Sequence, residues 1–132
     1  MTEPSHGGIP EEWRQVARKD WGRIRRQLED GDPDAAGYFL QQSIEKYLKA
    51  FLIQHGWTLR KIHVLHELLT DAIRYQPALA SFRQLCERVS GYYLVDRYPP
   101  LAPSELTSGD VQRDLVEATR LIQTLFPQEP VE

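Results

Sequence analysis

Apolar side chains recur at intervals of three and four residues along most of the chain, and no long alternating run competes with them. This period is typical of helices with one buried face. The first helix is expected from Pro10 to about Leu28. Placed at 100° steps, its apolar side chains share one arc: Trp13, Ala17, Trp21, Ile24 and Leu28. Arginines and lysines flank this arc on both sides, so the helix is predicted to face the core with basic edges.

Capping residues divide the rest of the chain into further helices. Asp32 and Pro33 supply an N-cap and a first-turn proline for a second, longer helix, which Gly56 ends. Within it, Glu45 and Lys49 are spaced to form an ion pair one turn apart. We expect that pair on the face opposite the apolar one.

Three more helices follow in the predicted order. Thr107 and Asp110 have the spacing of a capping box, which indicates where the last helix begins. Five helices joined by short connections predict an all-α fold, an up-and-down four-helix bundle with an additional short helix. The remaining elements are a third helix over Lys61–Tyr75, a fourth from Pro77 to about Val95, an irregular loop over 97–109 and a last helix that ends before Pro127.

Length, charge and cysteine content limit the classes of protein to which the chain can belong. A chain of 132 residues suits one domain, and we expect a disordered N-terminus over 1–9, a single helical domain over 10–126 and a C-terminal tail over 127–132. The net charge of −3 gives no overall attraction to nucleic acid. A single cysteine, Cys86, excludes an internal disulfide and fits a reducing compartment. With no long apolar run, no membrane association is expected, and the predicted location is cytoplasmic.

Histidine spacing gives little support for a metal site. His66 and Glu67 begin a zinc-protease pattern, but Thr70 stands where the second histidine belongs. His63 and His66 lie three residues apart, yet no third ligand is evidently placed beside them. We therefore expect neither a metal nor another cofactor.

Two polar features do suggest chemistry. Asp20 falls inside the apolar arc of the first helix and so needs a partner, either an arginine or lysine of another helix or a polar site within the bundle or a dimer interface. Arg97 stands between Tyr93 and Tyr98, next to the proline-rich loop. An arginine flanked by tyrosines suits phosphate contact with base stacking, although a packed corner has the same composition.

Three segments together resemble a known family. Gln41–Lys49 resembles the Gln-x-x-x-Glu-Lys-x-Leu-Lys signature of the HEPN family, named for higher eukaryotes and prokaryotes nucleotide binding. Lys61–Leu65 is similar to its Lys-Thr-His-Asp-Leu segment, with Ile and Val in place of Thr and Asp. Tyr93–Pro99 is similar to its Tyr-x-x-x-Arg-Tyr-Pro stretch. The resemblance covers about residues 13–125.

The resemblance implies a HEPN-like bundle that pairs as a symmetric homodimer with a cleft facing RNA or a nucleotide. Many members are metal-independent ribonucleases and act as toxins beside a minimal nucleotidyltransferase. Those enzymes use an arginine followed after four to six residues by a histidine. Here positions 102–104 after Arg97 are Ala, Pro and Ser, so that histidine is missing and enzymatic activity is left open.

These observations lead to one hypothesis and two alternatives. The protein is expected to be a HEPN-type homodimer that binds a nucleotide or RNA phosphate, the partner of a minimal nucleotidyltransferase in a toxin–antitoxin-like module. Binding is assigned to Arg97, Tyr93, Tyr98 and Lys46, and any catalysis to Arg97 with His63. One alternative is an active ribonuclease in which His63 or His66 replaces the missing histidine. The other is a protein-interaction module without a ligand.

Overall fold

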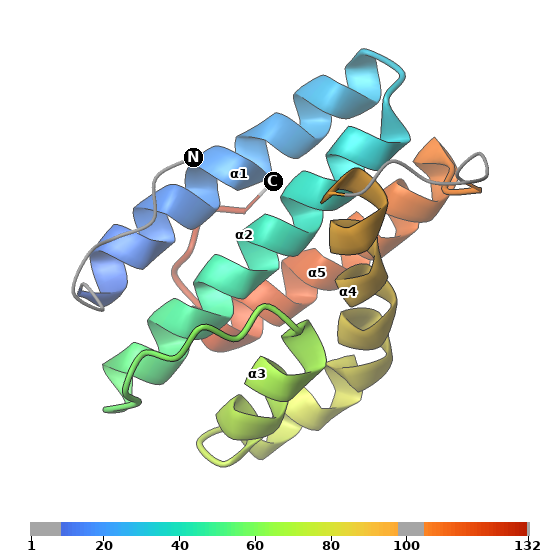
Figure 1. The fold of residues 1–132 in the computed structure, drawn as a ribbon. Coiled ribbons are helices and arrows are strands. Elements are labelled where there is room, and N and C mark those ends of the chain that lie inside the picture. The colour runs from blue at the N-terminus through green and yellow to red at the C-terminus, as the bar shows by residue number, and fades with distance from the viewer. Residues whose placement is uncertain (1–8, 98–104, 132) are drawn as a thin grey trace.

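In the computed structural model, the described residues 9–97 and 105–131 form helices and connecting segments without a strand (Figure 1). For residues 93–97 it describes the backbone alone. The elements are α1 (Pro10–Glu29), α2 (Pro33–Gln54), α3 (Leu65–Ile73), the 3-10 helix η1 (Pro77–Phe82), α4 (Arg83–Arg97) and α5 (Ser108–Leu125). The predicted all-α class is confirmed, with α3 as the additional short helix.

The helices begin where the capping residues indicated. The Asp32 carboxylate accepts a hydrogen bond of 3.1 Å from the backbone N–H of Ala35 in the first turn of α2. At the start of α5, Thr107 and Asp110 exchange side-chain and backbone hydrogen bonds of 3.1 Å each. Gly56 follows α2 with a φ of 88°, a left-handed conformation that favours glycine. Local chemistry therefore accounts for these helix ends.

The helices α1 and α2 lie side by side and antiparallel, with α5 behind them and α4 crossing beside α2 (Figure 1). The predicted apolar arc of α1 faces the core: Trp13, Ala17 and Ile24 are buried, while Trp21 and Leu28 are partly buried against it. Helix α2 is enclosed along most of its length, since α1, α3, α4 and α5 all pack on it. Polar groups in the central part of α2, from Leu40 to Leu52, are therefore placed in a low-dielectric setting.

Two predicted boundaries were wrong. The third helix begins at Leu65 instead of Lys61, because the preceding segment is held extended across α2. The side-chain amide of Gln41 donates to the carbonyl oxygen of His63 at 3.0 Å, and the backbone N–H of Leu65 donates to Ser90 Oγ at 2.9 Å. The helix expected from Pro77 instead starts as the 3-10 turn η1 and becomes α-helical at Arg83.

Within the part of the chain that the structure describes, none of the helices has the length and apolar character needed to cross a membrane.

Candidate functional site

A row of polar side chains runs along α2 inside the bundle. It comprises these buried residues: Gln41, Gln42, Glu45, Lys46 and Lys49. Buried charges require both a counter-charge and hydrogen bonds, and an apolar side chain at such a position is often equally stable or more so. Together with Ser43, which donates to the Ala17 carbonyl oxygen, six polar residues of one helix are buried. This is more than packing requires, so the row is the main candidate for a functional site.

Hydrogen bonds connect the row into one network. Lys46 Nζ donates to Gln42 Oε1 at 2.9 Å, and Gln42 Nε2 donates to Gln41 Oε1 at 2.7 Å. Gln41 Nε2 then donates to Glu45 Oε1 at 3.2 Å, and Lys49 Nζ donates to Glu45 Oε2 at 2.9 Å. Glu45 is thus the acceptor on which the network converges.

The predicted ion pair between Glu45 and Lys49 exists, but its predicted place on an outer face was wrong. Both side chains are buried, and Lys49 Nζ lies 5.5 Å from the centre of the Trp13 ring. A cation over an aromatic face is attracted to it, most strongly where water is excluded. The sequence period could not show that α2 is covered on its polar side as well.

His63 connects this network to the surface. The imidazole Nδ1 lies 3.1 Å from Glu45 Oε2, and the side chain is 45% exposed. A carboxylate accepts a hydrogen bond from the protonated Nδ1. This bond fixes the ring orientation and makes Nε2 the basic nitrogen. His63 and the buried lysine-containing network therefore form one connected group of side chains.

The charges of the network keep Glu45 ionised. Burial alone raises the pKa of this carboxyl, but the positive charges of Lys46 and Lys49 and the hydrogen bond from Lys49 lower it more strongly. The net pKa lies below the usual value for glutamate. Glu45 is therefore a fixed negative charge between the two lysines and His63.

Asp20 is fully buried on α1, as its place in the apolar arc predicted. Its hydrogen-bond partner comes from its own helix instead of another one, because Arg23 Nη1 lies 3.0 Å from Asp20 Oδ1. The positive charge of Lys46 on α2 also stabilises the ionised form of Asp20. Among the residues that the structure describes, Asp20 Oδ2 has no hydrogen-bond partner. Burial raises the pKa of Asp20 to about 6, against the opposing effect of Lys46 and Arg23.

Substituting Asp20 with asparagine is expected to stabilise the protein at pH 7.5. The folded state binds the Asp20 proton more tightly than the unfolded chain does, so unfolding free energy falls as the pH rises from about 4 to about 6. A shift of about two pKa units corresponds to ~3 kcal/mol. The variant should therefore melt several degrees above the wild type at pH 7.5, and the difference should shrink towards pH 4. Melting curves across this range test it, with exposed Asp30→Asn as the control; a difference that does not change with pH would contradict it.

The C-terminal half of α4 carries two of the predicted binding residues. The Ser90 hydroxyl of α4 accepts the Leu65 N–H, so the segment that bears His63 meets α4 at this point. Seven residues make almost two helical turns, which puts Arg97 on the same helix face as Ser90 and roughly 10 Å further along. Tyr93 is one turn from Ser90 on nearly the same face. The side chains of Tyr93 and Arg97, and all of Tyr98, lie outside the described residues.

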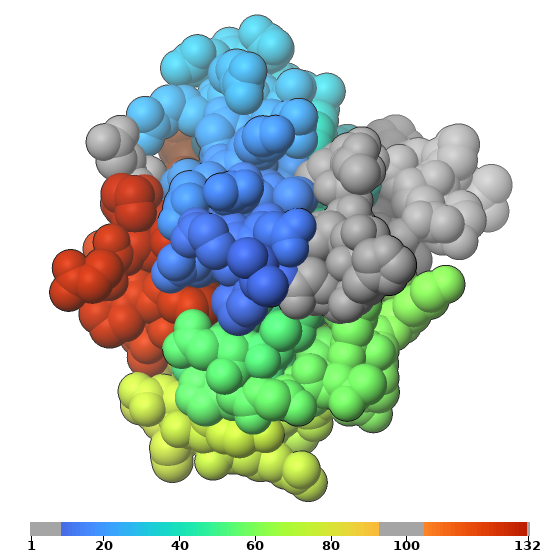
Figure 2. Space-filling model, turned by 90° about the vertical axis from the view of Figure 1, so that its left-hand side faces the viewer, coloured from blue at the N-terminus to red at the C-terminus, as the bar shows by residue number. Residues whose placement is uncertain are grey.

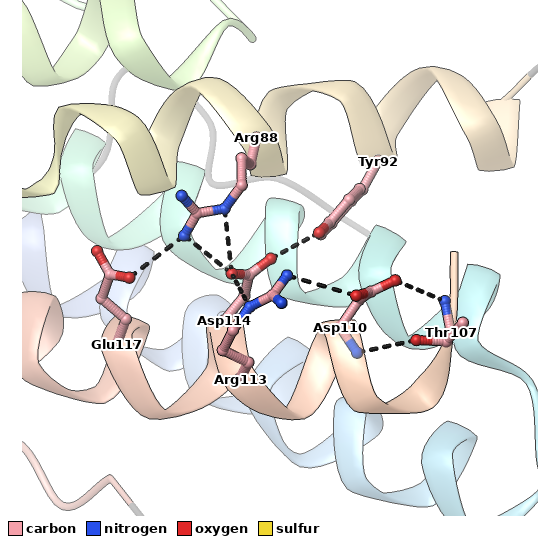
Figure 3. Close-up of polar contacts among 7 residues, drawn as sticks. All are labelled: Arg88, Tyr92, Thr107, Asp110, Arg113, Asp114 and Glu117. Atoms are coloured by element: carbon pink, nitrogen blue, oxygen red, sulfur yellow. Dashed lines mark hydrogen bonds and ion pairs between the residues drawn. The ribbon is translucent and has the colours of Figure 1, made fainter. Parts of the chain in front are cut away.

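A cluster of polar contacts between α4 and α5, here called the α4–α5 clamp, fixes this half of α4 (Figure 3). It consists of Arg88, Tyr92, Asp114 and Glu117. Tyr92 donates from its hydroxyl to Asp114 Oδ2 at 2.6 Å, and Arg88 Nη2 donates to Asp114 Oδ1 at 3.0 Å and to Glu117 Oε1 at 3.2 Å. Asp114 is fully buried, and burial together with its charge raises the pKa of Tyr92.

Gly37 lets α2 approach the clamp. A Cβ atom at this position would lie 2.9 Å from Leu106 Cδ2 and 3.2 Å from Tyr92 Cδ2, both closer than normal contact. The ring of Tyr92 is therefore held between the N-terminal part of α2 and α5. Sequence reasoning missed Gly37, Tyr92 and Asp114, because a mid-helix glycine and a polar residue on an apolar face are weak features in isolation.

Within the described part of the chain, no group of three or more His, Cys, Asp or Glu side chains is arranged to hold a metal ion. Of the two histidines singled out by spacing, His63 belongs to the α2 network. His66 lies in α3 with a buried Nδ1 that has no hydrogen-bond partner among the described residues. The two histidines thus occupy different environments.

Comparisons with known proteins give one family match and two solved structures of similar fold. The family model described as HEPN domain matches residues 10–127. The crystal structure of TT1696 from Thermus thermophilus superposes with a TM-score of 0.80 at 21% identity, covering 91% of this chain and 98% of that one. ST0689, described as an archaeal HEPN homologue, superposes with a TM-score of 0.71 at 24% identity, covering 91% and 97%. No curated protein sequence matches the chain significantly.

Proposed function

The chain belongs to the HEPN domain family, and from this premise we propose that it is a homodimer that binds a nucleotide or an RNA phosphate, as partner of a minimal nucleotidyltransferase in a toxin–antitoxin-like module. The family is in general related to nucleotides and RNA. We assign binding to Arg97, Tyr93, Tyr98 and Lys46, and any catalysis to Arg97 with His63.

The observation that carries the proposal is the buried α2 network that reaches the surface at His63. A bundle stabilised by packing alone has no need of this arrangement. Before His63 is counted, three positive side chains of the region (Arg23, Lys46 and Lys49) outnumber two negative ones (Asp20 and Glu45). A net positive charge in a low-dielectric setting attracts phosphate more strongly than the same charge in water.

The contact between the His63 segment and α4 supports a single binding site that includes residues from both. The hydrogen bond from Leu65 to Ser90 brings the His63 segment against the helix that carries Tyr93 and Arg97. Arginine binds phosphate oxygens through paired donors, and tyrosine rings stack on bases. Residues from α2, α4 and the α2–α3 connection would thus contribute to one site.

Arg97→Ala is expected to weaken binding of a fluorescein-labelled single-stranded RNA by tenfold or more, because the substitution removes a charged, bidentate phosphate contact. Fluorescence anisotropy at two salt concentrations measures the affinity, and the salt dependence should be smaller in the variant. Arg120→Ala, an exposed arginine of α5, is the matched control and should bind like the wild type. Equal affinity of all three proteins would contradict the proposal.

The proposed assembly is tested on the same preparations. Light scattering should give twice the chain mass of 15.3 kDa, and a species of 15.3 kDa would count against a cleft formed by two copies. Co-expression with a minimal nucleotidyltransferase should yield a complex. A protein partner that co-purifies while no nucleotide or RNA binds would instead favour an interaction module.

A metal-independent ribonuclease is the second candidate, favoured by the contact between His63 and Glu45. Cleavage of RNA without a metal needs a group that accepts the 2′-hydroxyl proton, and an imidazole oriented by a carboxylate is suited to this. Arg97 would stabilise the charge on the phosphate. RNA incubated with chelator should then be cut by the wild type and left intact by His63→Ala and by Arg97→Ala. If the wild type does not cleave RNA, the ribonuclease hypothesis is excluded and the binding proposal remains.

A further inference from the structure

The C-terminal tail is attached to α1 and α2 by one charged side chain. After Phe126, the tail follows α1 on the side opposite the α2–α3 connection, as Figure 2 shows with the tail in red and that connection in bright green on either side of α1. Of the described residues 127–131, Glu129 alone is buried. Val131 is partly buried against the core, so the Glu129 carboxylate is the main polar attachment of the tail and not its whole contact.

Those groups form a pocket of two arginines and a tyrosine. Arg18 Nη2 donates to Glu129 Oε1 at 3.0 Å and Arg18 Nε donates to Oε2, which is a bidentate contact. Tyr47 donates from its hydroxyl to Oε2 at 2.8 Å. Arg14 Nη1 lies 3.9 Å from Oε1, beyond hydrogen-bond distance. The pocket thus has the donors of an anion-binding site.

The tyrosine is part of the core, so the floor of the pocket is rigid. Tyr47 is fully buried in α2, and its ring lies 6.3 Å from that of Phe126. Burial and the neighbouring charge of Glu129 raise the pKa of Tyr47, so its hydroxyl stays protonated and remains a donor. Arg14 packs its guanidinium 4.8 Å from the centre of the Phe126 ring.

Glu129 leaves part of this donor set unused. Arg14 Nε is buried and has no hydrogen-bond partner among the described residues. Glu11 engages Arg14 Nη2 at 2.6 Å and Arg18 Nη1 at 3.0 Å, so the two arginines are balanced by two carboxylates. Without Glu129 the pocket would carry a net charge of +1. A tetrahedral oxyanion offers more acceptors, in more directions, than the planar carboxylate.

We propose that Arg14, Arg18 and Tyr47 form a binding site for a phosphate group, and that Glu129 occupies this site in the free protein as an intramolecular competitor. A phosphate enters only when the tail leaves. Because the segment after Phe126 contributes one buried side chain, Glu129, and one partly buried side chain, Val131, its release is a local opening that leaves the helices of the bundle packed. The site shares no residue with the α2 network that contains His63 and does not rest on the function proposed above.

Glu129→Ala in the full chain tests the site with inorganic phosphate as the probe. Melting temperatures are measured against phosphate concentration, with sodium chloride adjusted to constant ionic strength. The variant should be stabilised by phosphate with an apparent Kd at least tenfold lower than that of the wild type, in which Glu129 competes. Glu129→Gln, which preserves the shape of the tail but not its charge, should show a gain in the same direction.

Two further variants identify the donors. Adding Arg18→Ala to Glu129→Ala should abolish the gain, whereas adding Arg26→Ala, an exposed arginine of the same helix, should preserve it. Acetate should stabilise Glu129→Ala less than phosphate does. The proposal is overturned if Glu129→Ala and Glu129→Gln respond to phosphate as the wild type does, if the gain survives loss of Arg18, or if acetate is as effective as phosphate.

Discussion

Replacing Glu45 with alanine is expected to lower the free energy of unfolding by about 3–5 kcal/mol, the range for removal of one partner from a buried ion pair. Lys49 would remain buried without its bonded counter-charge, Lys46 would be left with the charge of Asp20, and the Gln41 amide and His63 would each lose an acceptor. This is among the largest effects expected from a single substitution in this chain.

Urea denaturation at pH 7 measures the effect. Glu87→Ala is the matched control, since Glu87 is exposed on α4 and should change stability by about 0.5 kcal/mol or less. Glu45→Gln separates charge from shape, because the amide retains one acceptor oxygen but provides no negative charge for the lysines. A loss below about 1 kcal/mol in Glu45→Ala would show that the lysines are reached by water and that the network is not closed.

Replacing Asp114 with alanine should lower the free energy of unfolding by about 2–4 kcal/mol. The substitution removes the acceptor of both the Tyr92 hydroxyl and the Arg88 guanidinium. The Tyr92 hydroxyl would then lie in the packed region between α4 and α5 without its hydrogen-bond acceptor. Since the α4–α5 clamp fixes the half of α4 that carries Arg97, RNA affinity should fall as well. Arg97 itself is unchanged in this variant.

The two consequences of Asp114→Ala are measured separately. Stability is followed by denaturation, and RNA affinity is measured at a temperature where the variant is fully folded. Gln112→Ala, at an exposed position of the same helix, should change neither. Tyr92→Phe removes the hydroxyl alone and should cost about 1 kcal/mol. Unchanged stability in Asp114→Ala would mean that packing, and not the clamp, sets the position of α4.

Helix positions could be predicted because their causes are local. Asp32 and the pair Thr107 and Asp110 act on backbone groups within three residues of themselves, and the structure contains the hydrogen bonds that their spacing implies. The apolar arc of α1 depends only on the helical period. Where a distant segment intervened, the prediction failed: Gln41 of α2 holds the backbone of His63 extended and delays the start of α3.

The candidate site could be predicted only in part. Lys46 and His63 were proposed from their resemblance to the family motifs; in the structure His63 contacts Glu45, and Lys46 donates to Gln42 of the same network. The burial of Glu45 and Lys49 was not predicted, because charges at helical spacing look the same in sequence whether water or another helix covers them. The contacts of Glu129 could not be predicted from the sequence, since its partner Arg18 lies 111 residues earlier in the chain.

The helical class, most helix ends, the core face of α1 and the family of the chain follow from the amino-acid sequence. These depend on the period of apolar residues, on caps and on short motifs, all of which act over a few residues. The packing of distant segments encloses the polar face of α2, brings the charge of Lys46 to Asp20 and places Glu129 in a pocket of arginines, and none of these contacts could be predicted from the sequence. Burial, and the electrostatic strength it gives to a charge, depends on which distant segments pack together.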